Sequence, residues 1–114
     1  MNTSYYSKYK GENAVSIAGK CPDWYHGRQY KVLAPKYWFF KKYKEDGDIA
    51  FYTEQYQKEV LDQLDAKQVF EELGENAVLL CWEKSGSFCH RHLAAAWLEK
   101  QLNIEVKELE LPIK

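Results

Sequence analysis

The feature that most constrains the fold is a continuous apolar run at residues 77–82, AVLLCW. It does not alternate between apolar and polar residues, which is the pattern of a strand covered on both faces. A short polar loop follows at 83–88, and residues 90–102 then repeat apolar residues at helical spacing with an alanine-rich face. This order predicts a central strand of a layered sheet, followed by a loop and a helix.

Other segments predict the elements that surround this strand. Residues 3–8 and 14–18 are β-prone, and residues 106–111 alternate as a half-exposed final strand. Residues 20–30 hold Pro22 and Gly27 without a steady period, so we expect a long loop there. The remaining segments have helical spacing with cap residues at their ends. They run from Pro35 to Gly47, over 49–64, and from Asp65 to Gly74.

These elements predict the α/β class, with one three-layer domain over residues 1–114 and a small, mainly parallel sheet flanked by helices. With 114 residues, 46% hydrophobic and 29% charged, the chain can bury a core without disulfides or a structural metal. Three cysteines, an odd number, and a start without signal-peptide regions predict a reducing, cytoplasmic location. No apolar run approaches the ~18 residues of a membrane helix, so we expect no membrane association.

Charge and aromatic residues are distributed unevenly. Residues 1–44 hold nine Lys or Arg against Glu12 and Asp23, while the remainder holds seven against fifteen acids. Fourteen of the eighteen aromatic residues lie between Tyr5 and Tyr56. Such a segment could stack bases and hold phosphates, so nucleic acid is one possible partner. The alternative is that the rings pack the core and the lysines form a solvated face.

The loop at 83–88 and the helix start after it form the predicted site, because ligands of open α/β sheets bind at the carboxyl ends of strands. Free amides at the helix start and the guanidinium of Arg91 suit a phosphate or carboxylate. The loop lacks the spacing of a P-loop, so nucleotide hydrolysis is not indicated. The structural alternative is a capped helix with Arg91 paired to Glu83.

Cys81 and Cys89 allow a thiol nucleophile, a redox pair, or metal ligands together with His90 and His92. Cys89, at a helix start, has the more favoured thiolate, whereas Cys81 at a strand end resembles a buried small hydrophobe. Their spacing matches no common zinc knuckle and no C-x-x-C pair, so no metal and no cofactor are predicted. His90 could transfer a proton, or donate a hydrogen bond to a loop carbonyl while exposed.

The segments 79–84, 88–93 and 97–98 resemble the signature of the domain of unknown function 488 family, and the likeness covers nearly the whole chain. The resemblance implies a compact intracellular α/β domain of bacteria, archaea or phages. It also implies that the Cys-Glu-Lys segment at 81–84 and the Cys-His-Arg segment at 89–91 meet in one pocket. It implies no established activity.

The leading hypothesis is therefore a domain that binds a nucleotide-like or phosphorylated small ligand, with catalysis left open. The alternatives are a nucleic-acid-associated or host-defence protein of phages or their hosts, and a protein-interaction domain. Candidate catalytic residues are Cys89, His90 and Glu83. Candidate ligand-binding residues are Arg91, Lys84, Ser87, Ser4, Tyr5, Tyr6, Trp24 and Tyr25. The aromatic members are expected to form the other wall of the pocket. The sequence does not predict an oligomeric state.

Overall fold

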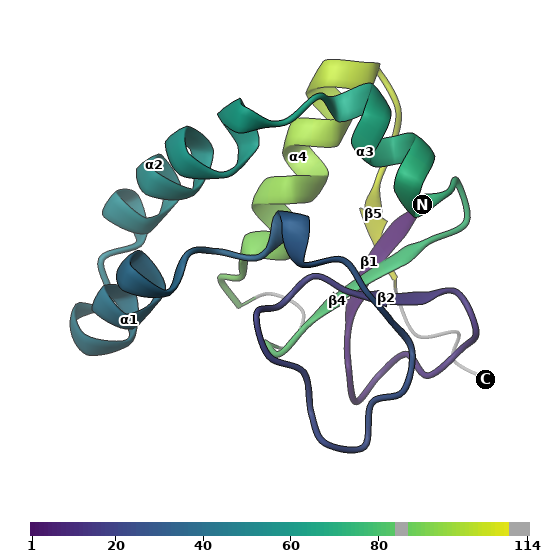
Figure 1. Ribbon diagram of the computed structural model, residues 1–114, viewed down its shortest axis with the longest axis horizontal. Helices are drawn as coiled ribbons and strands as arrows, with labels where there is room; N and C mark the ends of the chain where they lie inside the picture. The colour runs from purple at the N-terminus through teal and green to yellow at the C-terminus, as the bar shows by residue number, and fades with distance from the viewer. Residues whose placement is uncertain (84–86, 110–114) are drawn as a thin grey trace.

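A computed structural model describes residues 1–83 and 87–109, and shows one five-stranded sheet in the order β3-β2-β4-β1-β5 (Figure 1). Every paired strand runs parallel to its neighbour. The strands are β1 (Asn2–Tyr5), β2 (Ala14–Ser16), β3 (Arg28–Gln29), β4 (Val78–Cys81) and β5 (Lys107–Glu108). The predicted α/β class with a parallel sheet is confirmed.

β4 is the central strand, as the apolar run at 77–82 predicts. All four of its residues are buried, because its neighbours β2 and β1 cover both edges and side chains cover both faces. Leu79 packs into a large core cluster with the helices, while Leu80 packs into a second cluster on the other side. Because apolar side chains cover both faces of β4, polar residues cannot alternate with apolar ones along this strand.

The helices are α1 (Tyr37–Asp46), α2 (Ile49–Glu59), α3 (Ala66–Leu73) and α4 (His90–Leu102), with short 3-10 turns η1 (Lys31–Leu33) and η2 (Leu61–Gln63). Their ends follow local signals. Gly47 ends α1 in the left-handed conformation at φ 67°, which favours glycine. The Asp48 and Asp65 carboxylates accept backbone N–H groups at the starts of α2 and α3. α2 ends at Glu59, earlier than the predicted segment 49–64.

The two faces of the sheet are covered differently. Buried residues of α1, α2, α3 and α4 share one cluster with Val15 and Leu79. The second cluster joins Val78 and Leu80 to Tyr6 and to loop residues such as Tyr25. Loops therefore build the second outer layer, in place of the helices predicted for that face. Within the described ranges, no helix has the length and hydrophobicity to cross a membrane.

The helices α1 and α2 extend to one side of the sheet, beyond the carboxyl end of β4 (Figure 1). In the chain, η1, α1 and α2 follow β3 one after another. The start of α4 lies at the same end of β4, because the loop after Cys81 leads directly into it. This arrangement brings α1, α2, β4 and α4 together around one space.

Candidate functional site

A cavity of about 710 Å³ lies at the carboxyl end of β4. The strand end and the start of α4 contribute Cys81, Cys89 and His90, and the aromatic residues of α1 and α2 lie across from them. This is the position at which open α/β sheets bind their ligands. Four residues that the sequence singled out line this cavity, namely Cys81, Glu83, Cys89 and His90.

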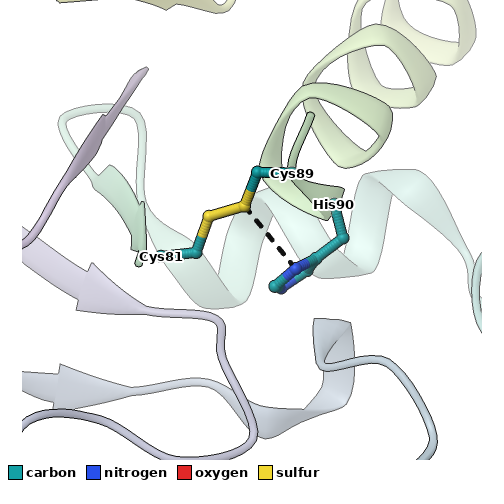
Figure 2. A group of neighbouring side chains, drawn as sticks. All are labelled: Cys81, Cys89 and His90. Atoms are coloured by element: carbon teal, nitrogen blue, oxygen red, sulfur yellow. Dashed lines mark hydrogen bonds between the residues drawn. A yellow bond between two sulfur atoms is a disulfide. The ribbon is translucent and has the colours of Figure 1, made fainter. Parts of the chain in front are cut away.

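Cys81 and Cys89 are joined by a disulfide, with His90 beside it (Figure 2). Cys81 is the last residue of β4, and Cys89 is the residue that precedes the first turn of α4. Although Cys81 is as buried as the sequence predicts, its sulfur is not merely packed, because it is bonded to Cys89. The third cysteine, Cys21, is free and half-buried.

His90 is buried and has a fixed hydrogen-bonding pattern. Its Nε2 lies 2.7 Å from the carbonyl oxygen of Ile17, and a carbonyl can only accept, so Nε2 carries the proton. Its Nδ1 is therefore an unprotonated acceptor, 3.8 Å from Sγ of Cys89. Burial lowers the pKa of His90 to about 4. The ring is neutral near pH 7, and it is buried rather than exposed in a loop.

Arg91 does not line the cavity, contrary to the predicted role as an anion ligand. Its side chain is fully buried and forks onto Glu108, with Nε–Oε1 and Nη2–Oε2 distances of 3.0 and 2.8 Å. Its Nη1 donates to the carbonyl oxygen of Glu83 at 2.7 Å and lies 3.0 Å from Sγ of Cys81. Because Glu108 already pairs with Nε and Nη2, the guanidinium contacts the disulfide through Nη1 and does not face a ligand in the cavity.

Glu83 stands at the rim of the cavity. Its carboxylate lies 3.9 Å from Nζ of Lys44 on α1 and 4.0 Å from Sγ of Cys81. The predicted pairing of Arg91 with Glu83 involves the backbone oxygen of Glu83, not its carboxylate. Lys84, another predicted ligand residue, lies outside the described residues. Ser87 is exposed near the end of the same loop.

The N-terminal aromatic residues predicted to form the other wall lie elsewhere. Tyr6 contacts Trp24, Tyr25 and Trp82 through edge-on rings, with centroids 6.4, 5.4 and 5.3 Å away. Tyr6 also shares a hydrogen bond of 2.6 Å with the hydroxyl of Ser16, and it belongs to the second core cluster. Of this aromatic group, only Trp82 lines the cavity.

The two remaining candidates on β1 are also directed at the protein. Tyr5 lies with its ring centroid 5.8 Å from the guanidinium carbon of Arg91. Ser4 is fully buried, and its Oγ has no hydrogen-bond partner among the described residues. Neither residue lines the cavity. β1 places both beside β4, as expected, but inside the fold.

The aromatic wall is formed instead by α1, α2 and the loop before α4. Its members are Tyr37, Phe40, Tyr43, Tyr52 and Phe88. Tyr43, Tyr52 and Phe88 contact one another, with ring centroids 5.1 to 5.3 Å apart. Burial, together with the nearby Glu83 carboxylate, raises the pKa of Tyr52, so its hydroxyl stays protonated. The helical spacing between Pro35 and Gly47 predicted this helix, but only the fold turns its aromatic face toward the cavity.

Basic residues of the segment 1–44 are partly engaged within the molecule. Arg28 donates to the carbonyl oxygens of Leu73 and Glu72, each at 2.9 Å, at the end of α3. Lys10 lies 4.8 Å from the ring centroid of Trp24. Lys8 donates to the carbonyl oxygen of Leu109, whereas Lys20 lies at the cavity.

Cys81, Cys89 and His90 also bring their donor atoms within 4.8 Å of one another. Such soft donors suit a transition metal only when both sulfurs are free thiolates. As a disulfide, the two sulfurs lack that charge. The disulfide has a neutral imidazole on one side and a guanidinium on the other. This arrangement is therefore better suited to thiol–disulfide chemistry than to metal binding.

Comparisons with known proteins give one match. A family model described as "DUF488-N3a: Active DUF488-N3 subclade" matches residues 3–102. This match confirms the resemblance that the Cys-Glu-Lys and Cys-His-Arg segments carry. No curated protein and no solved structure matches the chain.

Proposed function

This chain belongs to the DUF488-N3a family, described as the active DUF488-N3 subclade, and we propose that it binds a nucleotide-like or phosphorylated small ligand in the 710 Å³ cavity. The ligand would combine a flat aromatic part with an anionic group. The proposed location is the cytoplasm, in keeping with the odd cysteine count.

The observation that carries this proposal is the aromatic lining of the cavity. Phe40, Tyr43 and Tyr52 present ring surfaces from two helices, and Phe88 faces them from the loop before α4. Any nucleobase can stack on such rings, because every base has a flat aromatic face. The volume also lies within the roughly 300–1,000 Å³ that small-molecule sites occupy. An apolar enclosure with few polar groups at its edge is the usual form of such a site.

Cations at the rim support the anionic part of the ligand. Lys20 and Lys44 both line the cavity. Lys44 is paired with Glu83 at 3.9 Å, and its side chain is 55% exposed, so this ion pair is weak and a phosphate can replace the carboxylate. The start of α4 adds its positive dipole end, since Cys89 makes no side-chain cap there.

The experiment is calorimetric titration of the purified protein with a panel of nucleoside mono-, di- and triphosphates and sugar phosphates. We expect Phe40→Ala to weaken binding roughly tenfold, because loss of one stacking ring costs about 1–3 kcal/mol. Lys44→Gln is expected to weaken binding several-fold and to reduce its salt dependence. Lys41→Gln is the matched control, because Lys41 lies on the same helix and pairs with Glu45 outside the cavity.

Two results would contradict the proposal. One is the absence of binding by every member of the panel to protein whose circular dichroism shows it to be folded. The other is binding that Phe40→Ala and Lys44→Gln leave at the level of the Lys41→Gln control. Either result would mean that the aromatic lining serves the fold, not a ligand.

A further inference from the structure

We propose that Cys81 and Cys89 form a redox-active dithiol–disulfide site that exchanges with small-molecule thiols and disulfides entering the cavity. The site shares its cavity with the ligand proposed above but does not require it, because exchange needs access to the two sulfurs alone. The inference rests on three observations, namely the position of the sulfurs, the guanidinium beside one of them and the imidazole beside the other.

The position of the sulfurs selects the size of the reaction partner. Cys81 and Cys89 both line the cavity, although their residues are only 1% and 3% exposed. A protein-sized thiol cannot reach sulfurs this deep, whereas a tripeptide or smaller thiol can enter the cavity. The substrate class is therefore a low-molecular-weight thiol or disulfide, such as glutathione.

Arg91 makes the sulfur of Cys81 the better leaving group. Its Nη1 lies 3.0 Å from Sγ of Cys81, so a thiolate formed there accepts a charge-assisted hydrogen bond. The bidentate pair with Glu108 holds the guanidinium in this position. Cleavage of a disulfide is faster when the departing sulfur is the more stable thiolate. This predicts that an incoming thiolate attacks Cys89 and expels Cys81.

His90 serves the other sulfur. Its Nδ1 lies 3.8 Å from Sγ of Cys89 (Figure 2). This nitrogen has a lone pair that can accept a hydrogen bond, because the proton of the ring is on Nε2 and is donated to the carbonyl oxygen of Ile17. In the reduced state the Cys89 thiol can donate a hydrogen bond to this nitrogen. This contact holds the Cys89 sulfur beside the cavity, where its thiolate can attack an external disulfide.

Two small-molecule thiols reduce the Cys81–Cys89 disulfide in two steps. The first thiolate attacks Sγ of Cys89, the bond to Cys81 breaks, and Cys81 leaves as a thiolate beside Arg91. A second thiolate attacks the sulfur of the bound thiol and releases a small disulfide and the Cys89 thiolate. Cys89 then takes up a proton. The protein gains two electrons, and the two thiols lose them. In the reverse direction, the dithiol reduces a small disulfide.

The charge around the sulfurs favours this chemistry over metal binding. The guanidinium of Arg91 already occupies one side of Cys81, and a metal ion would add further positive charge at close range. In addition, disulfides of proteins in reducing compartments are usually transient and either catalytic or redox-sensing. The predicted compartment of this chain is a reducing one.

The test uses the full chain with Cys21→Ser, which leaves only the two site cysteines. The protein is equilibrated with mixtures of reduced and oxidised glutathione, acid-quenched, alkylated and weighed by intact mass spectrometry. We expect two states, with no or two alkylated thiols, that interconvert as the glutathione ratio changes. Wild-type protein should show the same transition with the additional label on Cys21.

Trapping of the mixed disulfide tests the direction of exchange in the Cys21→Ser background. When the oxidised protein is mixed with reduced glutathione and acid-quenched early, peptide mapping should find glutathione on Cys89 and a free thiol on Cys81, because Cys81 is the better leaving group. Glutathione found mainly on Cys81 would overturn the assigned direction. Circular dichroism verifies that the protein is folded before the reaction.

Three results would overturn the site itself. They are thiols that stay reduced in pure oxidised glutathione, a disulfide that resists excess reduced glutathione in the folded protein, and one tightly held zinc ion per chain that blocks alkylation. Nucleotide titration of the same samples tests the ligand proposal separately, so either proposal can fail while the other stands.

Discussion

Replacement of Glu108 with glutamine is expected to destabilise the fold, because it removes the counter-ion of a fully buried arginine. The Arg91 side chain is 0% exposed and that of Glu108 is 19% exposed. Two short contacts, at 3.0 and 2.8 Å, join the guanidinium to both carboxylate oxygens. A glutamine amide can accept one of these hydrogen bonds, but its NH₂ group opposes the other donor and it carries no charge.

The expected loss is about 3 kcal/mol of the free energy of unfolding. Breaking a buried ion pair by removing one partner costs about 3–5 kcal/mol, because the remaining charge is left without compensation. We take the lower end of that range because Glu108 retains contact with solvent. Since domains are stabilised by only about 5–15 kcal/mol, the change is large enough to measure without difficulty.

Urea denaturation followed by circular dichroism measures this loss, with the midpoint expected to fall and the slope to stay constant. Glu105→Gln is the control, because Glu105 is 78% exposed and pairs with Lys107 at 3.7 Å. The control should change stability by less than about 1 kcal/mol. If Glu108→Gln were no more destabilising than this control, the ion pair would not anchor Arg91, and its guanidinium would return as a candidate anion ligand.

Three further predictions follow from the contacts of particular residues. Burial lowers the pKa of His90 to about 4, from 6.5 in the unfolded chain, so folding in acid releases a proton. The free energy of unfolding should therefore reach its full value above about pH 6.5 and decrease as the pH falls toward 4. Urea titrations should show about 2 kcal/mol less stability at pH 5 than at pH 7 from this residue, and His90→Gln should lessen the difference by about that amount. Asp65→Ala should cost about 1 kcal/mol by removing the N-cap of α3, whereas Glu71→Ala on the exposed face of α3 should leave the urea midpoint nearly unchanged. Nucleic-acid association predicts affinity for single-stranded oligonucleotides that falls steeply with salt and is lost in Lys10→Gln/Lys20→Gln; binding that is independent of salt would rule it out.

Local sequence signals predicted most of the elements. The apolar run at 77–82 fixed β4 as central, because a strand buried on both faces has no room for polar residues. Gly47 and Asp65 marked helix ends through their own backbone and side-chain geometry. β3 was not predicted, because Arg28 and Gln29 carry no strand pattern and pair only because β2 lies beside them.

The candidate site could be chosen from the sequence, because Cys81 and Cys89 flank one loop that must lie at the carboxyl end of the central strand. The burial and tautomer of His90 could not, since its partner is the backbone oxygen of Ile17, distant in sequence. The pairing of Glu108 with Arg91 could not be predicted for the same reason, because Glu108 reaches Arg91 only after β5 has paired with β1.

The α/β class, the central strand and the position of the Cys-His-Arg helix start could all be predicted, because they depend on residues close together in the chain. Tertiary structure alone decided that Cys89 bonds to Cys81, that Arg91 turns to Glu108, and that helices α1 and α2 supply the aromatic wall. These outcomes depend on which side chains become neighbours after the strands pair and the helices pack. A periodic pattern identifies the face of an element, but the element that covers that face is chosen by the whole fold.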